Sequence, residues 1–342
     1  MAPSAVGSFP VKEADISAMK AQTTTIGEVA DNGNVVNDAE PQPPVVKEVA
    51  ITEGERASGI MSKQNIEKAI VALNEDGVVV LTNAVDADAL DLLNGPMIEQ
   101  AKKLRDMPGT QFNYGEKAHN ILQHMIPDPN YLHPSIHANP FATQVCTFAL
   151  GPNPVLRYHK ANTNFPGDTR QPVHSDVHYE HPRACFALAV NIVPIDCDAN
   201  TGSTEVWLGT HATTIFSDQD GVNGIFPHLL AERRKIVPPV QPMLPRGSII
   251  IRDMRLWHAG MPNKTADTVR VMLNLIYFAD WYRCPMQIQF PPTAQTKIEQ
   301  LEKTSGTSIA ARYVEGLDHM TLRHTHDFAQ DDLREHWGRN IE

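Results

Sequence analysis

The sequence has few cysteines, and none of them form a C-x-x-C pair. Its 342 residues include four cysteines, and these are scattered along the chain at Cys146, Cys185, Cys197 and Cys284. This pattern indicates unpaired thiols in a reducing compartment rather than a disulfide framework or a zinc knuckle. No run of 18 apolar residues occurs, so no membrane span is expected. A basic stretch followed by an apolar one is also missing at the N-terminus, so we expect no secretory signal and a cytoplasmic protein.

An excess of basic charge is missing as well. The net charge is −11, from 29 Lys and Arg against 40 Asp and Glu. Binding to nucleic acid relies on clustered Lys and Arg, so we expect no nucleic-acid partner. The chain contains no G-x-G-x-x-G and no Walker A pattern, which excludes the usual nucleotide cofactors. What is present is the composition of a globular protein, with 42% hydrophobic and 20% charged residues.

The first part of the chain differs from the rest. Residues 1–56 are polar, contain the segment Pro41-Gln42-Pro43-Pro44, and show no sustained helical or alternating pattern. They are interpreted as a flexible N-terminal arm, or as a strap over the neighbouring subunit of a homodimer. Residues 57–342 are expected to form a single domain with a helical C-terminal extension.

Apolar spacing predicts helices first and strands later. Helices are expected from Ser62, which is a plausible N-cap, from Asp86 to Leu104 and from Pro134 to Leu150. Gly77 separates the first helix from a short buried strand. Further on, strands without a helix after each one favour an antiparallel closed or double sheet over a Rossmann fold. The predicted strands are 78–81, 155–164, 184–193, 205–208, 248–258 and 269–278.

The C-terminal region reads as helical and charged. Its clearest predicted helical pieces are Ile298–Lys303 and Ala310–Val314. A histidine-rich tail follows, and it is interpreted as solvated surface because no cysteine or fixed zinc spacing accompanies it. The tail contains His319, His324, His326 and His336.

One segment has the residues of half a metal site. His174 and Asp176 are two residues apart in a stretch rich in β-formers, so on a strand they point the same way. A second imidazole from His258 would complete the two-His, one-carboxylate set that binds Fe(II) in non-haem oxygenases. With 15 histidines in the chain, one H-x-D match is expected by chance about once. The motif by itself is therefore equally consistent with a hydrogen-bonded pair on a strand.

An arginine accompanies the second histidine. A hairpin centred near Lys264 would place His258 and Arg270 opposite each other, about 4.5–5.5 Å apart at Cβ. An inward-facing arginine needs an anionic partner. Either a bound dicarboxylate or an internal Asp or Glu would supply one, and the residues leave both interpretations open.

Taken together, these motifs resemble the phytanoyl-CoA dioxygenase family. The resemblance covers about residues 60–290 and is closest to the branch that oxidises natural products in fungal secondary metabolism. The family consists of Fe(II)- and 2-oxoglutarate-dependent oxygenases. The resemblance implies a mainly β, α+β fold with a double-stranded β-helix (jelly-roll, cupin-like) core and flanking helices. It is carried by His174-x-Asp176, Asn120–Gln123, Asn200–His211, Arg255–Gly260 and Arg270.

The resemblance also implies roles for individual residues. His174, Asp176 and His258 correspond to the ligands of Fe(II), and Arg270 to the residue that binds the far carboxylate of 2-oxoglutarate. Gln171 and Thr204 match positions that hydrogen-bond the co-substrate. O₂ is the third reactant. The chain departs from the family at Leu208-Gly209-Thr210-His211, where Pro-Gly-Ser-His is common, and His211 is interpreted as structural.

The expected activity is the oxidation of a small-molecule natural-product intermediate, by hydroxylation, desaturation, epoxidation or rearrangement. Tyr114, Tyr158, Phe165 and His178 are candidates for the substrate pocket, with a core or rim role equally open. Few Lys and Arg flank the motifs, so a neutral or weakly charged substrate is favoured over an acyl-CoA. Two alternatives remain: a cupin-like metal-dependent isomerase or hydrolase, and a non-catalytic jelly-roll binding protein.

Overall fold

The computed structural model describes residues 44–113, 119–323 and 327–330. Within these residues the chain builds a large eight-stranded sheet in the order β1-β2-β7-β5-β9-β4-β11, with β3 paired to β4. The two short strands β1 and β11 pair in parallel with their neighbours, and the other pairs are antiparallel. The strands are β1 (Glu48–Ala50), β2 (Val78–Thr82), β3 (Asn120–His124), β4 (Val155–Asn164), β5 (Ala187–Ile192), β7 (Ile249–Asp253), β9 (Arg270–Phe278) and β11 (Ser308–Ile309).

A small sheet faces the large one. It contains β6 (Glu205–Val206) and β8 (His258–Ala259), which pair in antiparallel fashion. Isolated bridges extend it from His174 to His258 and from Val206 to Val240. One apolar cluster joins the two sheets, with Val80 and Ile250 from the large sheet and Val206 from the small one. Two facing sheets of this kind form the predicted jelly-roll core.

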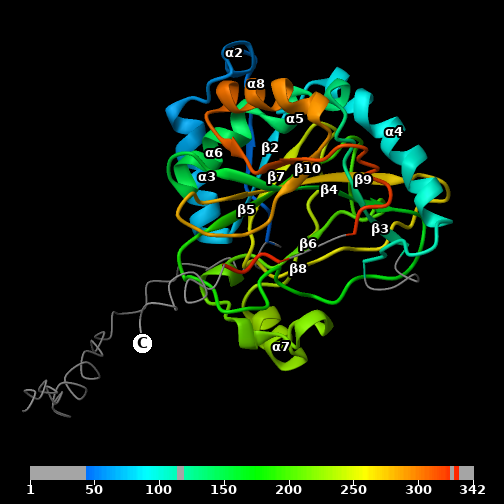
Figure 1. Cartoon of the computed structure of the whole chain (residues 1–342). Coiled ribbons are helices and arrows are strands. Elements are labelled where there is room, and N and C mark those ends of the chain that lie inside the picture. Colours follow the sequence, from blue (N-terminus) through cyan, green and yellow to red (C-terminus); the bar gives the residue numbers. More distant parts are fainter. Residues whose placement is uncertain (1–43, 114–118, 324–326, 331–342) are drawn as a thin grey trace, which may run out of the picture. The chain divides into compact units, whose positions relative to one another are not determined.

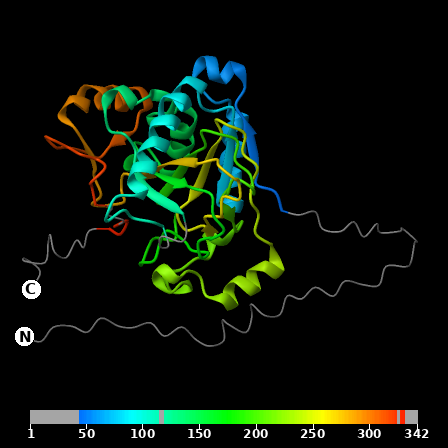
Figure 2. The same ribbon diagram turned by 90° about the vertical axis from the view of Figure 1, so that its right-hand side faces the viewer.

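The helices are divided between the two outer sides of this core. In Figure 1, α3, α4, α6 and α8 lie on the side of the large sheet that faces away from β6 and β8, and α7 lies beyond the small sheet. Figure 2 shows the same order from the side. The helices are α2 (Glu53–Ser58), α3 (Lys63–Asp76), α4 (Ala87–Arg105), α5 (Pro134–His137), α6 (Pro140–Leu150), α7 (Pro227–Ile236) and α8 (Gln295–Ser305). Short 3₁₀ helices are η3 (Pro129–Tyr131), η4 (Thr210–Ala212), η5 (Phe216–Asp218), η6 (Gly221–Asn223) and η7 (Pro292–Ala294).

Sheet alternation explains this arrangement. On β2 and β9, one face of each strand carries apolar side chains such as Val79 and Leu275, which share a core cluster with Leu73 of α3 and Leu93 of α4. The opposite face points between the two sheets. No helix in the described part of the chain is long and apolar enough to cross a membrane.

The predicted helix boundaries agree with the structure where a cap marks them. The Ser62 hydroxyl accepts a hydrogen bond from the Asn65 N–H at the start of α3, and Gly77 ends that helix in the left-handed conformation. The helix expected from Pro134 to Leu150 is instead two helices, α5 and α6. Asn139 interrupts it because its side chain caps α6 by accepting from Phe141 N and Ala142 N, which requires a non-helical backbone at that residue.

The predicted boundary of the N-terminal arm is wrong. β1 pairs with β2, α2 follows it, and Val46, Val49 and Ile51 are buried. The folded part therefore includes residues 44–56, which the sequence pattern missed because a three-residue strand is too short to show alternation. The rest of the predicted arm, residues 1–43, lies outside the described residues.

The C-terminal region is less helical than expected. α8 confirms the piece at Ile298–Lys303, but Ala310–Val314 is not a helix: Ala311–Tyr313 forms β12, parallel to β10 (Ile288–Phe290). Of the histidine-rich tail, His319 is described, and its Nε2 lies 3.1 Å from Gln100 Oε1. The other three, His324, His326 and His336, lie outside the described residues.

The hairpin expected around Lys264 is also wrong. Residues 248–258 do not form one strand, since β7 ends at Asp253 and β8 begins at His258. β8 pairs with β6 in the small sheet, whereas Arg270 pairs with Asn164 of β4 in the large sheet. His258 and Arg270 are therefore not cross-strand partners, because the connection between them crosses from one sheet to the other.

Candidate active site

Three side chains that are distant in sequence converge between the sheets. His174 and His258 exchange backbone hydrogen bonds of 2.9 and 2.8 Å, which brings the 174–176 segment alongside β8. Asp176 Oδ1 lies 3.9 Å from His174 Nε2 and 3.8 Å from His258 Nε2. The ligand atoms of the three residues all lie within 4.8 Å of one another, and they form the only such group of His, Cys, Asp and Glu among the described residues.

Hydrogen bonds orient both imidazoles for ligation. His174 Nδ1 lies 2.9 Å from the Pro172 carbonyl oxygen, and His258 Nδ1 lies 3.0 Å from that of Leu256. A carbonyl only accepts, so each Nδ1 carries the hydrogen and each Nε2 keeps its lone pair. Burial lowers the pKa of both histidines, which favours the neutral form that binds metal. The donor set and its orientation therefore fit a divalent iron.

The carboxylate is held by an arginine that sequence reasoning did not single out. Arg252 Nη2 donates to Asp176 Oδ2 at 2.6 Å. Burial by itself raises the pKa of Asp176, but the charge of Arg252, followed by those of His258 and His174, outweighs it and holds that pKa well below its usual range. One signal for Arg252 was available, because a charged residue interrupts the strongly apolar strand Ile249–Asp253.

A cavity of about 480 Å³ adjoins the three residues. Among the predicted co-substrate residues, Gln171, Thr204 and Arg270 line it, and so do the substrate candidates Tyr158 and His178. The remaining lining residues come largely from β3, β4, β5 and β9 together with the segment 111–113. They include Gln111, Phe112, Asn113, Asn120, Leu122, Asn162, Asn191, Gly260, Met272, Asn274, Ile276 and Phe328.

Arg270 is a buried cation without a carboxylate partner among the described residues. It is 1% exposed. Nη2 donates to the Gly202 carbonyl at 2.9 Å and Nη1 to that of Asn162 at 3.4 Å, while Nε has no partner in the described part of the chain. Burial lowers the pKa of Arg270. Among the described residues no Asp or Glu pairs with Arg270, so of the two partners considered from the sequence a bound dicarboxylate is the one still open.

Gln171 and Thr204 lie on the small-sheet side of the cavity. Gln171 Oε1 accepts a hydrogen bond from Gly260 N at 2.8 Å, which leaves its NH₂ group as a donor. Thr204 Oγ1 lies 3.9 Å from Met272 Sδ, a weak contact that a better acceptor can replace. Both positions are compatible with hydrogen bonds to a ligand held by Arg270.

One substrate candidate is not among the residues that line the cavity, and another is not described. Phe165 follows β4 and packs outside with Ala101, Leu104 and Ile121, and the Arg105 guanidinium lies 4.6 Å from its ring centroid. Phe165 therefore packs in a core cluster apart from this cavity, which is one of the roles that the sequence left open. Tyr114 lies outside the described residues.

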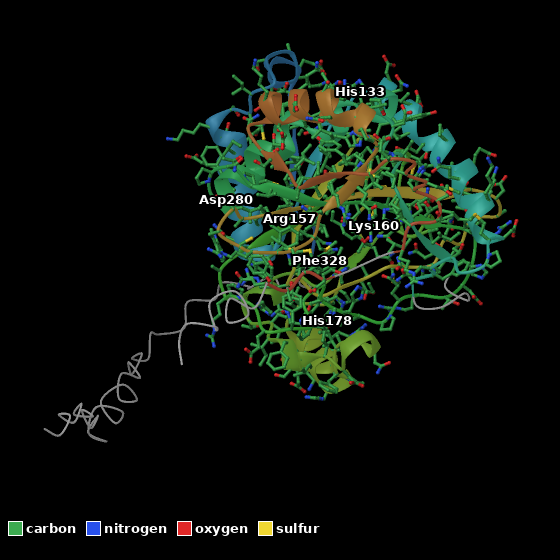
Figure 3. The ribbon with its side chains drawn as sticks, viewed as in Figure 1. His133, Arg157, Lys160, His178, Asp280 and Phe328 are labelled. Carbon is green, nitrogen blue, oxygen red and sulfur yellow. The ribbon has the colours of Figure 1, made fainter. Side chains whose placement is uncertain are left out.

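The C-terminal segment adds a wall that sequence reasoning missed. Phe328 lines the cavity, and its ring centroid lies 5.6 Å from that of Tyr158. Lys160 Nζ lies 4.8 Å from the centroid of the same tyrosine ring. Figure 3 labels Lys160 and Phe328. The Phe328 carbonyl accepts a hydrogen bond from Tyr282 Oη at 2.9 Å. No sequence pattern around residue 328 indicates this role, because it depends on the C-terminal segment packing beside β4 in the folded chain.

His211 is buried but does not line the cavity. It packs beneath Gly77, where an added Cβ would lie 2.5 Å from His211 Nδ1. This position agrees with its interpretation as a structural residue.

Comparisons with known proteins show which family model and which solved structures the chain matches. The family model described as phytanoyl-CoA dioxygenase (PhyH) matches residues 73–272, more than half of the chain. The structure of AviO1 from Streptomyces viridochromogenes Tue57 is similar, with 18% identity, a TM-score of 0.50, and coverage of 65% of this chain and 98% of that one. So is the epimerase SnoN in complex with Fe³⁺, alpha ketoglutarate and nogalamycin RO, with 16% identity, a TM-score of 0.51, and coverage of 79% and 97%. At these identities the two structures show a shared fold.

Proposed function

Because this chain belongs to the phytanoyl-CoA dioxygenase (PhyH) family, we propose that it oxidises a small-molecule natural-product intermediate. The chain is a non-haem iron, 2-oxoglutarate-dependent dioxygenase. Iron, 2-oxoglutarate and O₂ together supply an oxidant strong enough to attack a C–H bond, with succinate and CO₂ as co-products. Hydroxylation is the default outcome, and desaturation, epoxidation or rearrangement are its variants.

The single observation that carries the proposal is the convergence of His174, Asp176 and His258. We assign the two Nε2 atoms and Asp176 Oδ1 as the iron ligands, since these three atoms point toward one another. Three protein ligands on one side leave positions open for a chelating co-substrate and O₂. Arg252 keeps the carboxylate ionised and oriented, in the way that outer residues support metal ligands.

The co-substrate is assigned to the cavity wall that contains Arg270. A guanidinium can bind a carboxylate through two parallel hydrogen bonds, and this one is buried with only carbonyl partners among the described residues. Gln171 and Thr204 line the same cavity and are assigned hydrogen bonds to the co-substrate. Tyr158 and His178 are assigned to the substrate side.

The test is succinate release from 2-oxoglutarate with Fe(II) under air. Asp176→Ala is expected to abolish iron binding and to reduce succinate release to about 1% or less of wild type, because the carboxylate ligand is gone. Arg270→Ala is expected to raise the Kd for 2-oxoglutarate about 100-fold, since it removes the partner of a buried charge. The exposed residues Asp267 and Arg312 provide Asp267→Ala and Arg312→Ala as controls, both expected to behave as wild type.

Other outcomes would favour the alternatives. A cupin-like isomerase or hydrolase would bind metal through the same three residues and release no succinate. Its activity would be unchanged in Arg270→Ala. A non-catalytic binding protein would tolerate Asp176→Ala without loss of ligand binding. The homodimer stays a prediction, which light scattering after size-exclusion chromatography tests.

A further inference from the structure

Two buried asparagines face each other across the floor of the cavity. Asn191 of β5 and Asn274 of β9 are direct cross-strand partners, and both line the cavity. They are 3% and 6% exposed. Cross-strand partners have their Cβ atoms about 4.5–5.5 Å apart, so one ligand group can reach both amides.

Each of these two amides has one polar atom that the described residues leave without a hydrogen-bond partner. Asn191 Nδ2 and Asn274 Oδ1 have almost no solvent-accessible surface and no hydrogen-bond partner among the described residues, so a ligand group reaches them only when the amides rotate. Asn162, on the same wall, is different, because its Oδ1 accepts from Asn113 Nδ2 at 2.7 Å. A buried polar atom without a partner is destabilising, so the pair costs stability unless a ligand completes it.

Several neighbours of Asn191 and Asn274 in the sheet are apolar. Asn191 is flanked across the sheet by Ile250 of β7, and on β9 the residues on either side of Asn274 on the same face are Met272 and Ile276. Both also line the cavity. The other cross-strand partner of Asn274 is the buried Lys160 of β4. Apolar side chains at positions 191 and 274 would fit Ile250, Met272 and Ile276, so packing against these three residues does not account for two adjacent amides.

The position of the pair relates it to the metal end of the cavity. Arg252, which holds Asp176, pairs with Ala189, two residues from Asn191 on β5. Arg270 lies four residues from Asn274 on β9, about 13 Å along the strand at 3.3–3.4 Å per residue. The amide pair is thus separated from the site assigned to the far carboxylate of 2-oxoglutarate, and it lies nearer the residues that hold the iron ligand.

The chemistry of the pair favours a neutral ligand. Each amide carries a donor NH₂ group and an acceptor oxygen whichever way its O and N atoms are assigned. A carboxylate offers only acceptors and would leave the asparagine oxygens unpaired. A lactam offers an N–H beside a C=O and can satisfy a donor and an acceptor together. Tyr158 and Phe328, whose rings lie 5.6 Å apart, provide an apolar wall for the rest of a ring system.

We propose that Asn191 and Asn274 bind a neutral substrate group that has a hydrogen-bond donor next to an acceptor, as a lactam does. The inference rests on the proposed function and deepens it, since it names a substrate class for the same cavity: cyclic amides with an apolar ring. Both asparagines are then specificity-determining residues.

The first test uses the stability of the ligand-free protein. Asn191→Leu and Asn274→Leu are each expected to raise the Tm by about 2 °C or more, because each removes an unsatisfied amide. Asn162→Leu, the matched control from the same wall, is expected to lower the Tm because it removes the hydrogen-bond acceptor of Asn113 Nδ2. If either of the first two variants lowers the Tm as the control does, its amide has a structural partner and the inference fails.

The second test uses oxindole, N-methyloxindole and indane as probes. In anaerobic calorimetric titrations of the Fe(II)- and 2-oxoglutarate-loaded protein, wild type is expected to bind oxindole at least fivefold more tightly than the other two, which lack the N–H donor or the whole amide. Asn191→Leu and Asn274→Leu are expected to lose that preference while their Kd for 2-oxoglutarate stays within twofold of wild type. Equal or absent binding of the three probes by wild type overturns the inference, and so does a large rise in the Kd for 2-oxoglutarate.

The same titration without metal separates this inference from the proposed function. If wild type releases no succinate but the metal-free chain still prefers oxindole, the oxygenase assignment fails and the lactam site stands. If wild type releases succinate but shows no preference for oxindole, the oxygenase assignment stands and the lactam site fails.

Discussion

Arg252 Nη2 and Asp176 Oδ2 lie 2.6 Å apart, in an ion pair whose carboxylate turns its other oxygen toward two imidazoles. Arg252 is 5% exposed and the side chain of Asp176 is 20% exposed, so the arginine is shielded from solvent and the carboxylate is partly open to the cavity. Removing one member of a buried pair leaves an uncompensated charge, and here that charge belongs to the proposed metal ligand.

Arg252→Leu is expected to weaken iron binding about 10- to 100-fold, because Asp176 loses the group that orients it. The measurement is an anaerobic calorimetric Kd for Fe(II). Arg246→Leu is the matched control, since Arg246 also pairs with a carboxylate, that of Asp91, but at the surface. An unchanged Kd in Arg252→Leu would show that the ion pair does not support the metal.

Gly260→Ala is expected to disturb the co-substrate rather than the metal. An added Cβ would lie 2.6 Å from Gln171 Oε1, the atom that accepts from Gly260 N. Displacement of this amide is expected to raise the Kd for 2-oxoglutarate about tenfold, as the loss of one hydrogen bond to a charged group does. The Kd for Fe(II) should stay within twofold.

The control for that variant is Gly95→Ala, where an added Cβ meets no atom within 4 Å. Both constants should equal those of wild type there. Normal 2-oxoglutarate affinity in Gly260→Ala would remove Gln171 from the co-substrate site.

Gly77→Ala is expected to destabilise the fold by about 2–4 kcal/mol, since it adds a steric clash to backbone strain. Gly77 has φ +77, and its added Cβ would lie 2.5 Å from His211 Nδ1. Gly306→Ala separates the two effects, because Gly306 has φ +66 at a helix C-cap with open space around it. Strain alone costs about 1–2 kcal/mol. Urea denaturation measures both, and equal losses would show that His211 simply moves aside.

Glu55 provides a pH-dependent prediction. Its carboxylate accepts from Thr52 N at 2.9 Å, Ser62 N at 2.6 Å and Asn65 Nδ2 at 2.9 Å. Burial raises the pKa of Glu55, but the hydrogen bonds from Thr52 and Ser62 outweigh it and lower that pKa to about 2. Because the folded-state pKa lies below the unfolded one, the group stabilises the protein above about pH 5, and this contribution is lost as the pH falls toward 2.

Glu55→Gln should therefore cost about 2–3 kcal/mol at pH 7 and progressively less toward pH 3. The measurement is the free energy of unfolding from urea titrations at pH 3, 4, 5 and 7. Glu67→Gln, at an exposed position of α3, controls for the loss of one negative charge. A difference from wild type that does not shrink with falling pH would contradict the assigned hydrogen bonds.

Local patterns predicted much of the scaffold. The apolar runs that contain β5 and β9 and the caps of α3 were visible in the sequence, because strand alternation and helix capping depend on residues a few positions apart. The end of α5 before Asn139 and the end of β7 at Asp253 were missed. In both places the apolar pattern continues across the break, and the pattern does not show the hydrogen bonds that the interrupting residue makes.

Partners across the sheets were predicted less well. The hairpin register failed for His258 and Arg270, because the intervening loop changes sheets. Arg252 was overlooked since its partner, Asp176, lies in another segment. Phe165 was a candidate for the pocket, with a core or rim role equally open, and it follows the last residue of β4 and packs in a separate cluster.

The sequence by itself determined the kinds of ligand atoms and their local spacing: an imidazole and a carboxylate on one face of an extended segment, and a second imidazole in a motif of its own. These properties follow from residue type and strand geometry. Only the tertiary structure decided that His174 pairs with His258, that Arg252 holds Asp176, and that Asn191 meets Asn274. The physical reason is that sheet pairing joins residues far apart in the chain, and its register depends on how both sheets pack as a whole.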